Sequence, residues 1–250
     1  MSAVDSHQKT KQESRERPPL KAERREKKEP IPVLQSIEEL SELPVSVRAA
    51  REEDTYYRRH KNPDGSIGGF VANSRIADDV YVSPDCVISS SKVRNGTEIG
   101  TGVKIYSSTI GRNNVIGKAS ELSNVETGDR VSIGDGCFIT SRNTGEEDGD
   151  DSVTIEGNVK IGDEVEITNA YICTGVEVGD DSILDGFNQV YIGKRAKIGS
   201  SVKVEDAAML QPDATVPDGS TVLRHTTVDN FKVPKGSVKE AMRKLSPRKD

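Results

Sequence analysis

Few side chains in this sequence have a type and spacing suited to chemistry. Its histidines and cysteines are His7, His60, His225, Cys86, Cys137 and Cys173. They form no Ser–His–Asp or Cys–His arrangement, and the cysteines have no base beside them in the chain. The cysteines are far apart, odd in number and match no metal-ligand spacing. We therefore expect them to be inert packing residues, with no metal site and no disulfide framework.

A second chemical candidate is the acidic run Thr140–Val153, TSRNTGEEDGDDSV, which carries five carboxylates. Such a run could bind Ca²⁺ or a basic protein partner, although it lacks the spaced ligands of a defined calcium loop. A solvated acidic loop is the simpler interpretation.

A repeat defines the elements that must position these residues. Aliphatic residues recur at steps of six, six and five, so one coil has 17 residues. The first three coils have their aliphatic positions at Ile76, Val82, Ile88, Val93, Ile99, Ile105, Ile110, Ile116 and Leu122. The same phase returns at Ile155, and from Ile192 onward the step is a strict six. A period this persistent predicts a solenoid.

Six residues are enough for a short strand and a tight corner, and three such sides close one triangular turn. The aliphatic residue should point inward and stack on its equivalent about 4.8 Å along the axis. Small residues such as Ser91, Ser108 and Ala170 should pack inside near a corner. Narrow coils also explain why only 33% of the residues are hydrophobic and 4% aromatic. Within the coils, Asp185–Gln189 contains a two- or three-residue insertion, which we expect to be a bulge at a subunit contact.

Over about two thirds of its length, the chain resembles the left-handed parallel β-helix family of hexapeptide-repeat proteins. Coils with motifs such as Ser-Ser-Thr-Ile-Gly at residues 107–111 are also similar to the β-helix tails of sugar nucleotidyltransferases. The resemblance implies an all-β solenoid, a left-handed parallel β-helix of about eight coils of 17–18 residues over residues 63–230. It also implies a homotrimer.

The family consists mostly of acyltransferases that use acyl-CoA and a histidine of the coils as general base. Only His225 lies in the coils here, and it lies in the final one. One histidine cannot supply the three imidazoles of a zinc-dependent carbonic anhydrase. The Gly-Asn-Pro-Ala sequence usual after the last coil is also absent after ATVPDGSTV, residues 214–222.

Two functions follow from these observations. The preferred one is a non-catalytic scaffold without a cofactor, contacting a protein partner through its N-terminal arm or the loop 140–153. The run HKNPDGSIGGFV, residues 60–71, resembles hexapeptide-repeat proteins of phages and prophages. The alternative is an O- or N-acyltransferase that uses a CoA thioester, with His225 as general base and the acidic loop walling the substrate.

The flanks differ from the coils. We expect a disordered charged tail over residues 1–35 and a short helical cap over residues 36–62, including a polar helix at about 46–59. A C-terminal helix is expected within residues 231–250.

Charge and hydropathy indicate the compartment and the partners. Residues 61–231 carry 15 Lys and Arg against 27 Asp and Glu, which disfavours nucleic acid as a partner. No apolar stretch is long enough for a membrane span, and the first residues lack a signal-peptide core. We therefore expect a cytoplasmic protein.

Overall fold

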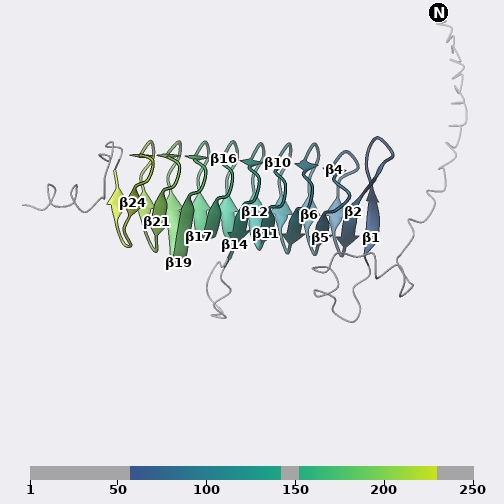
Figure 1. Ribbon diagram of the computed structural model, residues 1–250, viewed down its shortest axis with the longest axis horizontal. Coiled ribbons are helices and arrows are strands. Elements are labelled where there is room, and N and C mark those ends of the chain that lie inside the picture. The colour runs from purple at the N-terminus through teal and green to yellow at the C-terminus, as the bar shows by residue number, and fades with distance from the viewer. Residues whose placement is uncertain (1–56, 142–151, 230–250) are drawn as a thin grey trace, which may run out of the picture. The chain divides into compact units, whose positions relative to one another are not determined.

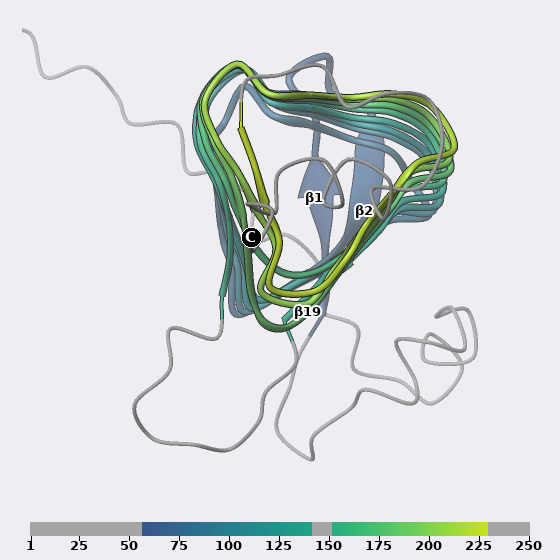
Figure 2. The same ribbon diagram turned by 90° about the vertical axis from the view of Figure 1, so that its left-hand side faces the viewer.

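A computed structural model describes residues 57–141 and 152–229 (Figure 1). Within these ranges the chain consists of short strands and tight turns, with no helix. The strands wind around three flat faces that meet at three corners (Figure 2). The result is a parallel β-solenoid of about nine turns. The predicted left-handed β-helix of about eight coils over residues 63–230 is confirmed, and Val71, fully buried, pairs in register with Ile88 in its first coils.

Each face is a ladder of parallel strands, apart from the antiparallel first strand, β1 (Arg58–Lys61). The first face holds β2 (Ile67–Ala72), β5 (Val87–Ser89), β8 (Lys104–Tyr106), β11 (Glu121–Ser123), β14 (Phe138–Thr140), β21 (Lys203–Glu205) and β24 (Thr221–Val222). The second face holds β3 (Arg75–Ile76), β6 (Lys92–Val93), β9 (Thr109–Ile110), β12 (Val125–Thr127), β15 (Val153–Ile155), β22 (Met209–Leu210) and β25 (Thr227–Val228). The third face holds β4 (Tyr81–Val82), β7 (Glu98–Ile99), β10 (Val115–Ile116), β13 (Ser132–Ile133), β16 (Lys160–Ile161), β18 (Glu177–Val178), β20 (Lys197–Ile198) and β23 (Thr215–Val216).

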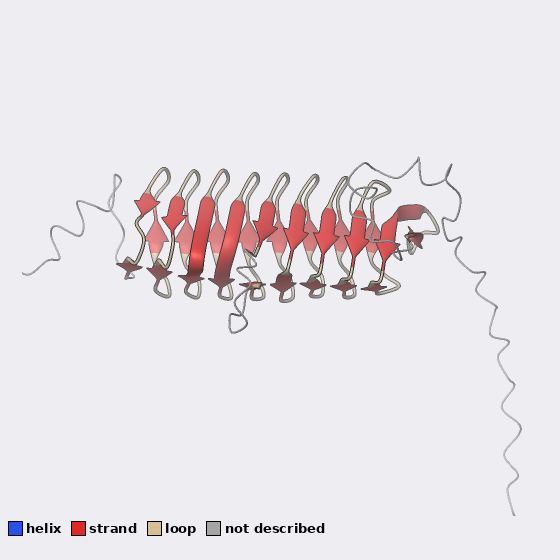
Figure 3. Ribbon diagram, turned by 90° about the horizontal axis from the view of Figure 1, so that it is seen from below, coloured by secondary structure: helices blue, strands red, loops and turns tan. Residues whose placement is uncertain are grey.

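Two long strands, β17 (Glu166–Ile172) and β19 (Ile183–Ile192), run from the first face onto the second without a break (Figure 3). We call the corner that they cross the first corner. Figure 2 shows β19 turning there.

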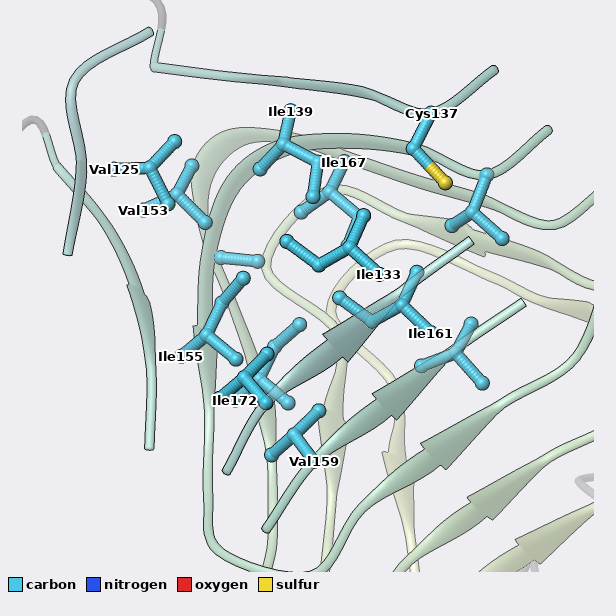
Figure 4. Close-up of a cluster of buried hydrophobic side chains, with 14 of the residues drawn as sticks. Val125, Ile133, Cys137, Ile139, Val153, Ile155, Val159, Ile161, Ile167 and Ile172 are labelled. Carbon is cyan, nitrogen blue, oxygen red and sulfur yellow. The ribbon is translucent and has the colours of Figure 1, made fainter. Parts of the chain in front are cut away.

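Inward-pointing aliphatic side chains stack along each face, because equivalent residues of successive coils pair in register. Figure 4 shows Ile139 beside Ile167 on one face and Ile133 beside Ile161 on another, matching the strand registers. Ile139 and Ile167 are fully buried. At about 25 cal/mol per Å² of apolar surface, such ladders are the main favourable term in a chain with so few aromatic residues. The predicted inward packing of the small corner residues is also confirmed, since Ser91, Ser108 and Ala170 are buried.

Two breaks in the 17-residue spacing confirm the predicted departures from the repeat. Ile139 pairs with Ile167, 28 residues later, so the acidic excursion lengthens one coil by eleven residues. Thr168 pairs with Asp185, whereas Ala170 pairs with Val190, so β19 contains a three-residue insertion relative to β17. Residues 142–151 of the excursion lie outside the described ranges.

The N-terminal end of the solenoid is closed by β1 and by polar side chains. The Asn62 side chain accepts a hydrogen bond from Val82 N at 2.9 Å and donates one to Val82 O at 3.1 Å, as a neighbouring strand would. His60 Nε2 lies 3.1 Å from Val80 O. Residues 58–61 are thus a strand rather than part of the helical cap expected over residues 36–62, because they pair with β2.

Three further expectations fall outside the described residues: the charged tail over residues 1–35, the remainder of the cap, and the C-terminal helix over residues 231–250. The described part of the chain contains no membrane-spanning helix.

Candidate functional site

His225 is exposed at the first corner of the last described coil, in the left-handed backbone region with φ of 55°. Its amide donates a hydrogen bond of 3.0 Å to the carbonyl of Asp206, one turn earlier on the same corner. His60 is different, since only 7% of it is exposed and burial lowers its pKa. His7 lies outside the described residues. Of the described histidines, His225 is therefore the one that solvent and a ligand can reach.

The first corner also collects the departures from the repeat. The register runs from Thr140 through Thr168 and Asp185 to Glu205, so the residues after these four occupy equivalent places in successive coils. The acidic excursion follows Thr140, the three-residue insertion follows Asp185, and Asp206 follows Glu205. His225 follows one coil later. One edge of the prism thus carries both insertions, Asp206 and His225.

The insertion is held from both sides by hydrogen bonds. From the coil before it, Asn169 Nδ2 donates to Phe187 O at 3.2 Å. From the coil after it, Asp206 accepts three hydrogen bonds through its carboxylate. Phe187 N and Asn188 N donate to Oδ1 at 2.9 and 2.5 Å, and Asn188 Nδ2 donates to Oδ2 at 3.1 Å. Hydrogen bonds from both neighbouring coils therefore fix the conformation of the insertion.

These contacts determine the charge state of Asp206. Partial burial acts to raise the pKa of its carboxyl, but the hydrogen bonds from Asn188 and Phe187, together with the nearby His225, outweigh burial and hold the pKa below its usual range. Asp206 is therefore a carboxylate at neutral pH. It lies on the same corner as His225, whose amide donates to the Asp206 carbonyl. The arrangement can serve general-base catalysis.

The cysteines have no part in this site. Cys86, Cys137 and Cys173 are free thiols and at most 2% exposed. Burial raises the pKa of Cys86 to about 11, and it also raises the pKa of Cys137. A buried thiol that stays protonated is a poor nucleophile, so the burial fits the expected packing role. No group of three metal-ligating side chains occurs among the described residues.

The sequence analysis missed one polar cluster, on the second face and the corner after it. Glu156 accepts hydrogen bonds from Thr174 N and Oγ1 at 2.8 and 2.7 Å and from Tyr171 Oη at 2.9 Å. The Tyr171 ring stacks on Tyr191 with centroids 5.8 Å apart. The Cys173 thiol donates to Tyr191 Oη at 3.2 Å. Tyr171 and Tyr191 occupy equivalent positions in successive coils, so the spacing of the repeat alone could have revealed that they lie side by side. These mutual contacts clamp neighbouring coils together.

No protein-family model matches the chain. Over 179 residues, 67% of its length, the chain is 30% identical to the bifunctional protein GlmU of Clostridioides difficile (strain 630), and it spans 36% of that protein. It thus covers about a third of the length of the curated relative that it matches. The chain has the left-handed parallel β-helix fold of hexapeptide-repeat proteins.

Solved hexapeptide-repeat structures resemble it distantly. LpxA from Acinetobacter baumannii is 18% identical with a TM-score of 0.39, over 71% of this chain and 75% of that one. The UDP-N-acetylglucosamine acyltransferase from Campylobacter jejuni is 16% identical with a TM-score of 0.38, over 62% of this chain and 67% of that one. The sequence-based preference for a non-catalytic scaffold is wrong, since the sequence match to the bifunctional protein GlmU favours the alternative. The scarcity of histidine in the coils was too weak an argument for it.

Proposed function

We propose that this hexapeptide-repeat protein is an acyltransferase that uses an acyl-CoA donor, with His225 as its general base. One observation carries the proposal: the exposed imidazole of the coils lies on the same corner as the insertion and as a carboxylate held charged by three hydrogen bonds. The scaffold interpretation implied no cofactor, whereas this proposal requires a CoA thioester as the acyl donor.

The proposed acyl transfer requires few catalytic groups from the protein. A CoA thioester, when bound, supplies an activated acyl group. His225 removes the proton from an acceptor hydroxyl or amine as its oxygen or nitrogen attacks the thioester carbonyl, a role typically worth 10²–10⁴-fold in rate. The exposed Arg224 beside His225 offers a cation to the phosphates of the donor.

We further propose that the protein works as a cytoplasmic homotrimer with the first corner at the subunit boundary. Large apolar side chains are exposed on the two faces that meet at that corner and at the corner itself, which favours a buried contact there. They are Phe138, Ile183, Phe187 and Met209. In this arrangement, the acidic loop 140–153 walls the substrate from the neighbouring subunit.

Donor binding is testable with the full chain in a thermal-shift assay. A ligand at 100 times its Kd stabilises the folded state by about 2.7 kcal/mol. We expect acetyl-CoA and CoA to raise the Tm of the wild type and of His225→Ala alike, because the imidazole acts on the acceptor proton. Adenosine diphosphate should raise the Tm less. Absence of a shift with millimolar acetyl-CoA, CoA and longer acyl-CoA thioesters would refute the proposal.

A further inference from the structure

His60 belongs to the cap at the N-terminal end of the solenoid. It lies in β1 at the irregular step between Arg59 and Lys61, and it is almost completely buried. Its Nε2 lies 3.1 Å from the carbonyl oxygen of Val80, in the segment that joins β3 to β4. One imidazole contact thus ties β1, on the first face, to the corner between the second and third faces.

The cap protects both the core and a sheet edge. Val71 and Val82 belong to the first coil, which has no coil before it, yet both are fully buried. Beside His60, Asn62 pairs with the backbone N and O of Val82, and β1 pairs with β2. Without β1, β2 would be the terminal strand of the first face, and its outer backbone groups would be unpaired. Such an edge favours pairing with another strand.

The contact of His60 with Val80 determines which nitrogen carries a proton. A carbonyl oxygen only accepts hydrogen bonds, so Nε2 of the neutral imidazole is the donor and Nδ1 is the atom that would take up a second proton. The Val80 carbonyl can also accept from a charged ring. One carbonyl, however, replaces little of the hydration that an imidazolium loses when it is buried.

The charged groups around His60 do not offset this cost. Burial is the largest influence and lowers the pKa of His60. Arg58, on the same strand, also lowers it, whereas Asp78, in the segment that holds Val80, raises it. The neighbouring Arg59 lies on the Phe70 ring, with its guanidinium carbon 3.7 Å from the ring centroid. The closed cap therefore favours the neutral imidazole.

We propose that β1 is an acid-sensitive closure of the solenoid: proton uptake by His60 favours an open state in which the imidazole leaves its buried place and β1 separates from β2. This device does not depend on the proposed acyl transfer. It assigns His60 a role in opening the edge of β2, whereas His225, exposed at the other end of the coils, has no part in it.

The sign of the pH dependence follows from the burial. In the open state, the imidazole is hydrated and its pKa returns to the ordinary value of about 6.5. Because the pKa in the closed state is lower, the closed cap is stabilised above about pH 6.5, and this stabilisation is lost as the pH falls. Each pH unit below about 6.5 raises the open population up to tenfold, until the pKa of the closed state is reached.

Hydrogen exchange of the Val82 amide, followed by NMR on the full chain, reports opening directly, because this amide donates to Asn62. Protection is expressed relative to the unfolded chain at the same pH. Between pH 7.5 and pH 5, we expect it to fall about tenfold. The Gly179 amide, bonded to Ile198 O at 2.8 Å within the coils, is the internal control and should keep its protection. Full protection of Val82 at pH 5 overturns the proposal, as does an equal loss at Gly179, which would mean acid unfolding of the whole solenoid.

Two matched variants identify the group that takes up the proton. The Nε2 of Gln stands as many bonds from the backbone as that of His, so His60→Gln keeps a donor for Val80 but cannot titrate. We expect equal protection of Val82 at both pH values in this variant. His225→Gln removes the exposed imidazole and should respond to pH as the wild type does. A response that persists in His60→Gln, or that disappears in His225→Gln, would contradict the assignment to His60.

Discussion

The direction in which each strand residue points predicts two different outcomes for the same substitution. Ile167 is inward on β17, fully buried, and lies in register between Ile139 and Leu184. Ile183 points outward at the start of β19 and is 37% exposed. Ile→Ala removes three carbons, about 2.4 kcal/mol at ~0.8 kcal/mol for each. At Ile167 the cavity left behind adds to this, so the free energy of unfolding should fall by about 3–4 kcal/mol in total. At Ile183, solvent fills the space and the loss should be about 1 kcal/mol.

The assay is urea unfolding followed by far-UV circular dichroism, because the chain has no Trp to serve as a fluorescent probe. Ile167→Ala should lower the unfolding midpoint far more than Ile183→Ala. Since a shift of one residue in register exchanges the two sides of a strand, the pair reports directly on the register. An equal loss at both sites, or a larger loss at Ile183, would refute the assignment of faces.

Other outcomes follow from the same structure. Cys86, Cys137 and Cys173 should react with a thiol reagent only after unfolding, and fast labelling of any of them in the native protein would contradict their burial. Asp206→Asn should lower Tm at pH 7. Because the folded-state pKa of Asp206 lies below its unfolded value, this stabilisation is complete above about pH 4. The Tm difference from wild type should therefore shrink as pH falls below about 4, and a constant difference would exclude the linkage. Phe187→Ser should weaken self-association in sedimentation equilibrium while leaving the circular dichroism spectrum unchanged, and an unaltered trimer would place the subunit contact elsewhere.

The fold could be predicted because its information is local and repeated. Each coil shows its inward residue at a fixed step, so errors at one place are corrected by the next. The strand at residues 58–61 was missed because RRHK has no apolar alternation, and its partner β2 determines its conformation.

The candidate site was less predictable because it depends on neighbours across coils. His225 was identified by type alone. Asp206 was not, because its role depends on amides 18 and 19 residues earlier that only the insertion turns toward it. The insertion was recognised from the broken period, but the period does not show which carboxylate its amides meet. Only the three-dimensional arrangement of residues at the first corner shows that this carboxylate is Asp206.

The central claim is tested most directly by CoA release from acetyl-CoA, measured with a thiol reagent over a panel of amine and hydroxyl acceptors. The wild type and His7→Ala, a histidine control distant from the coils in sequence, should release CoA in an acceptor-dependent manner. His225→Ala should lose 10²-fold or more in kcat, as expected for a general base. Wild-type turnover that survives in His225→Ala would contradict the assignment of the base.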